Sequence, residues 1–207
     1  MQLSRPFFAI ISSLMVLASC TTTSQVSLDY ASGVGHVQPG SPEFSTQAFV
    51  DRRDLGPNEL GTVRTQIGTP VEHVQMTVPA ANAVTNAFGY ALQVRGMLAS
   101  PTAARFTVTG EVLDLHCKLL VHPYGYARLR VSVLEAATGR VIHSGTYEGE
   151  RQSSAYVPGS GSPVPLLRDL TSGALQDAVD RALDDPAMRA RIGSGSGEVS
   201  GWQPGMI

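Results

Sequence analysis

Three consecutive segments in the second half of the chain alternate apolar and polar side chains, which is the period of half-buried β-strands. In the first segment the apolar positions change parity. Phe106 and Val108 share one phase, whereas Leu115 and Leu119 take the other. Because one inserted residue moves every later side chain to the opposite face, the pattern predicts a bulge near Val112.

Turn-forming residues join these segments into a three-stranded antiparallel meander. A His-Pro-Tyr-Gly turn follows the first segment, and an Ala-Thr-Gly turn follows the second. The spacing around the second turn predicts that Arg128 lies near Glu148 and that Glu135 lies near Arg140. One side of this meander is polar.

Shorter strands and three helices are expected around the meander. Pro79 begins a helix that runs to about Arg95, and Pro165 begins a second helix that ends near Asp185. A short helix covers residues 186–191. Weaker alternation predicts four strands, at residues 26–30, 46–51, 60–64 and 71–76.

These elements predict an α+β fold: a mostly antiparallel sheet with the three-stranded meander, and two main helices packed on one face. We expect a single domain over residues 26–192. Residues 152–165 are rich in Ser, Gly and Pro and are expected to form a mobile loop. Residues 193–207 contain five glycines without periodicity, which predicts a disordered tail.

The first nineteen residues have the pattern of a secretion signal, with Arg5 ahead of the apolar residues 7–17. Eleven helical residues reach only about 17 Å, short of a hydrocarbon core of ~30 Å. Residues 17–20 read Leu-Ala-Ser-Cys, which resembles the lipobox of bacterial lipoproteins. Cys20 is therefore the predicted site of lipid attachment, and residues 20–25 the lipidated tether. The alternative is an ordinary signal peptide in which Cys20 is incidental.

The residue after the cysteine bears on location. Thr21 stands where an Asp would resemble the inner-membrane retention signal of enteric bacteria. We therefore expect the protein in the inner leaflet of the outer membrane, facing the periplasm. Two or three acyl chains would anchor the protein permanently, so the membrane is an expected partner.

Composition and charge narrow the possible partners. Lys and Arg total 15 and Asp and Glu total 17, which gives a net charge of −2 and no basic block. This balance argues against nucleic acid as a partner. The sequence has two cysteines, too few for a disulfide scaffold. If Cys20 carries lipid, Cys117 is the remaining thiol, and in an oxidising compartment burial is its expected state.

Sequence patterns of the familiar catalytic sites are missing: we find no G-x-S-x-G, H-E-x-x-H or phosphate-loop motif. His116, Cys117, His122 and His143 are the candidates for a metal site. However, His116 and Cys117 are adjacent in a strand and point to opposite faces. His143 shares its parity with apolar neighbours, which favours a core histidine. We expect no metal, no cofactor and no enzymatic activity, with an enzyme of dispersed site as a minor alternative.

A charged turn is the candidate for partner binding, because loops at strand ends often carry function. It consists of Asp51, Arg52, Arg53 and Asp54. The alternative is a solvated turn whose internal ion pairs contribute about 0–1 kcal/mol each. The carboxylates of Asp184 and Asp185 are interpreted as a helix end and a helix cap.

The order of elements resembles the YajG-like family of bacterial outer-membrane lipoproteins. The resemblance runs from Cys20 to about Ile192 and includes the meander and the amphipathic C-terminal helix. It implies an architecture and a location but no activity. The segments that carry it are residues 26–30 (VSLDY), 49–53 (FVDRR), 60–64 (LGTVR) and 91–96 (ALQVRG).

The expected function is therefore a lipid-anchored, non-catalytic accessory or scaffold protein of the periplasm-facing envelope, docked on an envelope protein complex. Lipoproteins of similar layout include auxiliary subunits of lipid-transporting ABC systems and activators of cell-wall synthases. This gives an alternative, in which the chain is an auxiliary lipoprotein of an ABC-type lipid-transport system and holds an acyl chain between sheet and helices.

Overall fold

The computed structural model of the chain describes residues 22–30, 39–65, 67–119, 121–154, 156–157, 159 and 161–194, with only the backbone of Ser194. The predicted signal peptide, Cys20 and most of the Gly-rich tail lie outside the described residues. Residues 193 and 194, which we expected in that tail, belong to the last helix.

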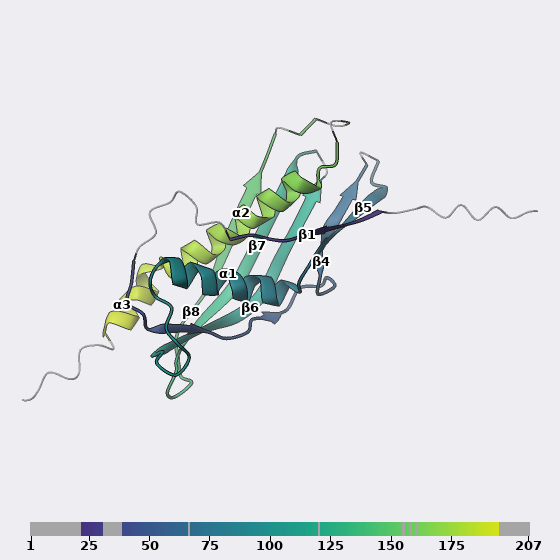
Figure 1. Cartoon of the computed structure of the whole chain (residues 1–207). Helices are drawn as coiled ribbons and strands as arrows, with labels where there is room; N and C mark the ends of the chain where they lie inside the picture. Colours follow the sequence, from purple (N-terminus) through teal and green to yellow (C-terminus); the bar gives the residue numbers. More distant parts are fainter. Residues whose placement is uncertain are drawn as a thin grey trace, which may run out of the picture.

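The described strands form one eight-stranded sheet with the order β1-β5-β4-β6-β7-β8, and β2 and β3 also pair with β6 (Figure 1). Their bounds are β1 Thr22–Val26, β2 Phe44–Thr46, β3 Val50–Asp51, β4 Glu59–Arg64, β5 Pro70–Met76, β6 Phe106–Leu119, β7 Pro123–Glu135 and β8 Val141–Gln152.

The long strand β6 organises the sheet and makes it mixed. One edge of β6 pairs antiparallel with β7. The other edge pairs with β2, β3 and β4 in turn, and all three run parallel to it. At the far edge, β1 also runs parallel to β5. The prediction of a mostly antiparallel sheet is therefore wrong, because alternation reports which face a side chain takes and carries no information on strand direction.

Two of the short predicted strands are placed differently. The first strand is Thr22–Val26, so residues 22–25 of the expected tether pair with β5. Leu28 and Tyr30, whose alternation suggested a strand, instead pack against the core from an irregular segment. The segment 46–51 contains the end of β2 and all of β3, separated by three residues outside the strands.

The meander follows the sequence pattern closely. The register of β6 and β7 shifts between Val112 and Asp114, which confirms the predicted bulge. Arg128 lies opposite Glu148, as the turn spacing predicted. Around the turn between β7 and β8, an Arg140 Nη atom lies 3.6 Å from a Glu135 carboxylate oxygen, as expected.

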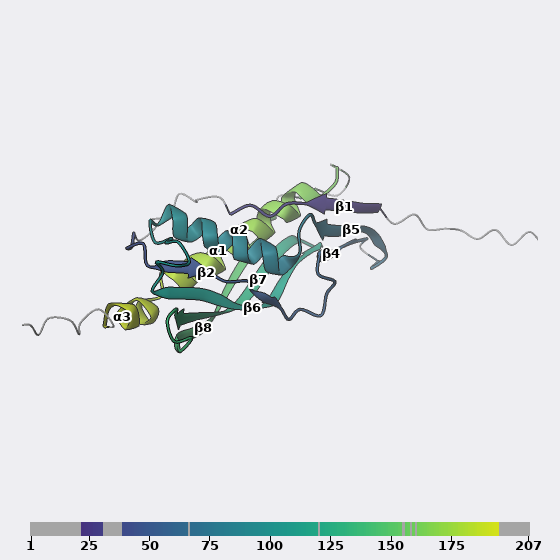
Figure 2. The same ribbon diagram turned by 60° about the horizontal axis from the view of Figure 1, so that its bottom comes forward.

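Helices α1 (Ala80–Val94) and α2 (Val164–Leu183) lie side by side on one face of the sheet, and α3 (Pro186–Ser194) follows α2 (Figure 2). Buried side chains such as Phe88, Leu115 and Leu167, each 0% exposed, fill the layer between them. No helix in the described part of the chain is long and apolar enough to span a membrane.

Candidate functional site: a polar groove on the open sheet face

The face of β6, β7 and β8 that points away from α1 and α2 is polar and uncovered by either helix; we call it the open face. Along β7, buried Ala127 and Leu129 face the helices, so Tyr126 and Arg128 point to the opposite side. Beyond the bulge, the same alternation turns His116 of β6 to this open face. The bulge therefore sets which β6 side chains join the polar surface.

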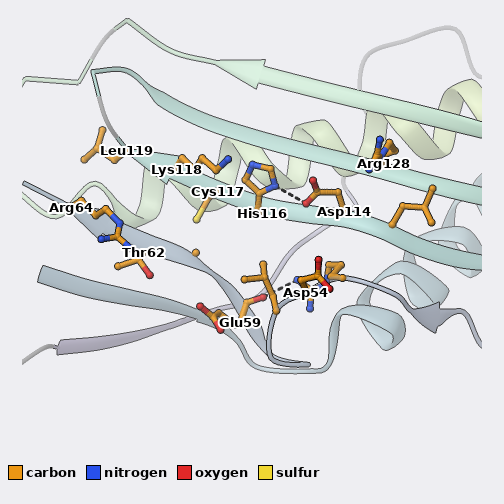
Figure 3. A pocket seen from close by; sticks show the side chains of 14 residues that line it. Asp54, Glu59, Thr62, Arg64, Asp114, His116, Cys117, Lys118, Leu119 and Arg128 are labelled. Atoms are coloured by element: carbon orange, nitrogen blue, oxygen red, sulfur yellow. Dashed lines mark hydrogen bonds and ion pairs between the residues drawn. The ribbon is translucent and has the colours of Figure 1, made fainter. Parts of the chain in front are cut away.

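A groove of about 660 Å³ opens where β4 and β6 separate, and it extends along the open face (Figure 3). β4 pairs with β6 only over Gly61–Val63, opposite Cys117–Leu119. The groove is lined by Arg53, Asp54, Leu55, Glu59, Gly61, Thr62, Arg64, Leu113, Asp114, His116, Cys117, Lys118, Leu119 and Arg128.

One wall of the groove carries an aspartate–histidine pair. The Nδ1 atom of His116 lies 2.6 Å from an Asp114 carboxylate oxygen (Figure 3). Burial alone would raise the pKa of Asp114, but the hydrogen bond with His116 holds that pKa below its usual range. The His116 ring packs against Tyr124 and Tyr126, with centroid distances of 6.0 and 5.6 Å. Its Nε2 atom is buried without a hydrogen-bond partner.

The charged turn predicted to bind a partner lies at the other wall, and its four residues divide into two kinds. The Arg53 side chain is only 1% exposed and makes hydrogen bonds to both Asp51 carboxylate oxygens, each at 3.0 Å. Arg52 is 61% exposed and pairs with Glu111 at 3.3 Å, while Asp54 lines the groove. Arg53 therefore braces the turn from inside, and partner binding by the turn stays a prediction.

The candidate metal ligands are not brought together. Among the described residues, no group of three or more His, Cys, Asp or Glu is placed to hold a metal ion. Cys117 is 1% exposed, as expected, and burial raises its pKa to about 12. His143 is also buried, and its Nε2 atom lies 2.8 Å from the Tyr147 hydroxyl. Asp184 ends α2 and Asp185 caps α3, as interpreted from the sequence.

Sequence reasoning missed the groove, although its polar strand positions were visible. The polar residues on the strand wall, such as Lys118 and Arg128, are on the polar parity of β6 and β7. What the sequence did not reveal is that β4 runs parallel to β6 and pairs with it over three residues only. A strand of six residues carries no signal of its direction.

A second cavity, of about 680 Å³, lies at the end of the sheet where β4 ends and β5 begins; we call it the end cavity. This end is at the upper right of Figure 1, close to the start of α2. The end cavity is lined by Val63, Arg64, Thr65, Val71, Glu72, Leu119, Val121, Tyr156, Gly159, Gly161, Ser162 and Pro163.

Comparison with known proteins shows the fold. No family model matches the sequence, and no curated protein matches it. The chain is similar in structure to protein XCC0632 from Xanthomonas campestris, a DUF330 protein, with 14% identity and a TM-score of 0.60 over 84% of this chain and 99% of that chain. At this identity the likeness establishes a shared fold only, and the YajG-like resemblance stays a prediction.

Two further solved structures are more distant. The PelC dodecamer from Paraburkholderia phytofirmans is 13% identical over 68% of this chain and 87% of that chain, with a TM-score of 0.41. Lipoprotein GNA1162 from Neisseria meningitidis is 11% identical over 58% of this chain and 89% of that chain, with a TM-score of 0.30. Likenesses this weak carry no argument about the present chain.

Proposed function

We propose that this chain is a lipid-anchored protein of the outer membrane, held in the inner leaflet and facing the periplasm, and that it acts as a non-catalytic accessory or scaffold of an envelope complex. The Leu-Ala-Ser-Cys sequence at residues 17–20 and the YajG-like order of elements support the anchor and the location. The observation that carries the scaffold role is the groove on a sheet face that neither α1 nor α2 covers.

The chemistry of the groove suits a protein segment with charges of both signs. Cationic side chains of Lys118 and Arg128 lie on the wall formed by β6 and β7, and anionic side chains of Asp54 and Glu59 lie on the opposite wall (Figure 3). The neighbouring Tyr124 and Tyr126 rings stack at 6.2 Å and supply flat apolar area. Tyrosine and arginine are enriched at the centres of protein interfaces, where complementary charges set specificity.

Charge reversal in the groove tests this role. In full-length protein from gently solubilised membranes, Lys118→Glu combined with Arg128→Glu should lower recovery of the co-purifying envelope complex at least tenfold. Arg140→Glu is the matched control, because Arg140 is 71% exposed in the turn at the opposite end of the meander. Equal recovery with all three proteins would contradict docking through the groove.

The anchor has its own test. A Cys20→Ala chain should leave the membrane fraction and lose the covalent acyl mass that the wild-type chain carries on mass spectrometry. A Cys117→Ala chain is the control, since it removes the buried thiol and leaves the anchor intact. A Cys20→Ala chain that stays fully membrane-bound would contradict the proposed anchor.

A second candidate is an auxiliary lipoprotein of an ABC-type lipid-transport system. The observation that favours it is the end cavity, whose walls include Val63, Val71 and Leu119. Apolar walls with a few polar groups are typical of sites for small apolar ligands. In this form the acyl chain would sit at the end of the sheet, and the layer between sheet and helices would remain protein core.

A further inference from the structure

The end cavity lies beside the point where the described chain begins. Thr22, the first residue of β1, pairs with Glu72, and Glu72 lines the cavity. The Thr22 hydroxyl also donates a hydrogen bond to the Val71 carbonyl at 3.3 Å. Cys20 precedes Thr22 by two residues, which span at most about 7 Å even when fully extended. A lipid on Cys20 would therefore bring this end of the domain to the membrane surface.

Apolar side chains are exposed at the same end. Val121, in the turn between β6 and β7, is 82% exposed, and Val71 at the start of β5 is 42% exposed. Ile67, in the turn between β4 and β5, is 89% exposed. Side chains of this size gain free energy when they leave water for the apolar region of a lipid layer. Val71 and Val121 also line the end cavity, which distinguishes them from single exposed apolar residues, which are common.

The mouth of the end cavity also carries a cation. Arg64 lines the cavity and is exposed, and one of its Nη atoms donates a hydrogen bond to the Gly68 carbonyl at 3.1 Å. This bond leaves further N–H groups of the guanidinium for an anion, and arginine matches the oxygens of a phosphate group well. The other charged wall residue, Glu72, accepts hydrogen bonds from Ser24 and from Ser162.

We propose that the end cavity binds one acyl chain of a membrane phospholipid, with the lipid phosphate at Arg64 and the exposed side chains of Ile67 and Val121 resting in the lipid surface. The proposal builds on the proposed lipid anchor, which places this end at the bilayer. A volume of about 680 Å³ is within the ~300–1,000 Å³ typical of ligand sites. The part of the acyl chain inside the cavity would leave water and contact the apolar walls formed by Val63, Val71 and Leu119.

Native mass spectrometry of full-length chains tests the proposal. Wild-type protein and the Cys20→Ala variant are each incubated with vesicles of phosphatidylethanolamine and phosphatidylglycerol and then re-purified in mild detergent. We expect both chains to retain one non-covalent phospholipid. A Val71→Asp, Val121→Asp double variant should retain at least tenfold less, and Val141→Asp should retain as much as wild type. Val141 is the matched control, because it is 55% exposed at the opposite end of the meander.

The outcomes separate this inference from the proposed anchor. The inference would be overturned if neither wild type nor Cys20→Ala retained a phospholipid. It would equally be overturned if the double variant retained as much phospholipid as wild type. The inference would also be overturned if no phospholipid were retained and the cavity were occupied only when Cys20 is lipidated. In that case the occupant would be the chain's own acyl group. Failure of the proposed anchor has a different signature, because the Cys20→Ala chain would then stay in the membrane fraction.

A second measurement locates the surface directly. A bimane label at Val121→Cys should be quenched at least twofold when the protein is anchored in vesicles that contain brominated phospholipid. The same label at Val141→Cys should not respond, because that residue lies at the far end of β8. Equal quenching of both labels would contradict contact between the lipid and the end of the domain that holds the end cavity.

Discussion

Arg53 holds a whole turn in place although it lies in a run of four charged residues. Its guanidinium donates hydrogen bonds to the Asp51 carboxylate and to four backbone carbonyls, which belong to Gly56, Pro57, Glu59 and Leu115. These bonds attach the segment between β3 and β4 to the middle of β6. Backbone carbonyls that lie away from water need a donor, and the Arg53 side chain supplies one to each of these four.

Removing this side chain should be costly. Arg53→Ala removes the guanidinium from the Asp51 carboxylate and from all four carbonyls, although the Gly56 and Pro57 carbonyls keep the backbone N–H donors of Glu59 and Ala80. We expect the substitution to lower the free energy of unfolding by about 3–5 kcal/mol. Arg52→Ala should cost about 0–1 kcal/mol, because the Arg52 pair with Glu111 is largely exposed. Urea denaturation followed by circular dichroism measures both. Equal losses for the two variants would contradict the structural role of Arg53.

Single residues differ in how well the sequence revealed them. Cys117 follows the apolar parity of its strand, so its burial could be predicted. The burial of Arg53 could not, because a charged side chain before a Gly-Pro turn is expected to be solvated. Its carbonyl partners lie in residues 56–59 and, 62 residues away, at Leu115. The long-range acceptor, the Leu115 carbonyl, leaves no trace in the composition around Arg53.

At the level of elements, glycines let α2 approach the meander closely. A Cβ atom on Gly149 of β8 would lie 1.9 Å from the Ala174 carbonyl oxygen in α2. A Cβ atom on Gly125 of β7 would lie 2.6 Å from backbone atoms of Leu170 and Thr171. In both places the obstacle is helix backbone, which cannot move aside as a flexible side chain can.

Adding one methyl group at this contact should separate the layers. We expect Gly149→Ala to lower the free energy of unfolding by about 1–3 kcal/mol, the typical cost of overpacking. Gly173→Ala is the matched control in the facing helix, since its Cβ would meet only the flexible side chain of Arg151 at 3.4 Å. That variant should be stabilised by about 0.5–1 kcal/mol, because glycine is a poor helix former. Thermal melts would contradict the prediction if both variants shifted in the same direction.

Element type was easier to predict than element pairing. The meander and α1 carry long periodic signals, and their registers or bounds agree with the sequence pattern. β2 and β3 contain three and two residues, too few for a period, so their parallel pairing with β6 could not be predicted. The same limitation hid the groove, whose shape depends on the short pairing of β4 with β6.

Across the whole molecule, an ionic cluster centred on the buried Arg95 joins segments that are far apart in the sequence. The Arg95 side chain at the end of α1 is 1% exposed and pairs with Asp180 at 2.9 Å and with Asp184 at 3.2 Å, both in or at the end of α2. It also donates a hydrogen bond to the Tyr30 hydroxyl at 3.1 Å. One arginine therefore connects three parts of the chain: α1, α2 and the irregular segment that follows β1.

This cluster makes overall stability sensitive to alkaline pH. Burial, reinforced by the hydrogen bond to Asp180, raises the pKa of Tyr30 from 10.0 to about 12. The folded state thus favours the neutral phenol, so its stabilisation is complete below pH 10 and is lost as the pH rises through 12. Tyr30→Phe should be less stable at pH 7 and should lose less stability between pH 10 and 12. Parallel pH profiles of the two proteins in urea denaturation would contradict this.

The direction of β1 has a mechanical consequence. Its five residues, Thr22 to Val26, pair in parallel register with Glu72 to Met76 at the edge of the sheet. A pull on the chain before Thr22, directed along the strand, loads this ladder in shear, so its hydrogen bonds share the force and give way together. The same ladder pulled sideways would open one bond at a time. A domain tethered through this strand can therefore resist a pull along β1, whereas a pull perpendicular to β1 would detach the strand more easily.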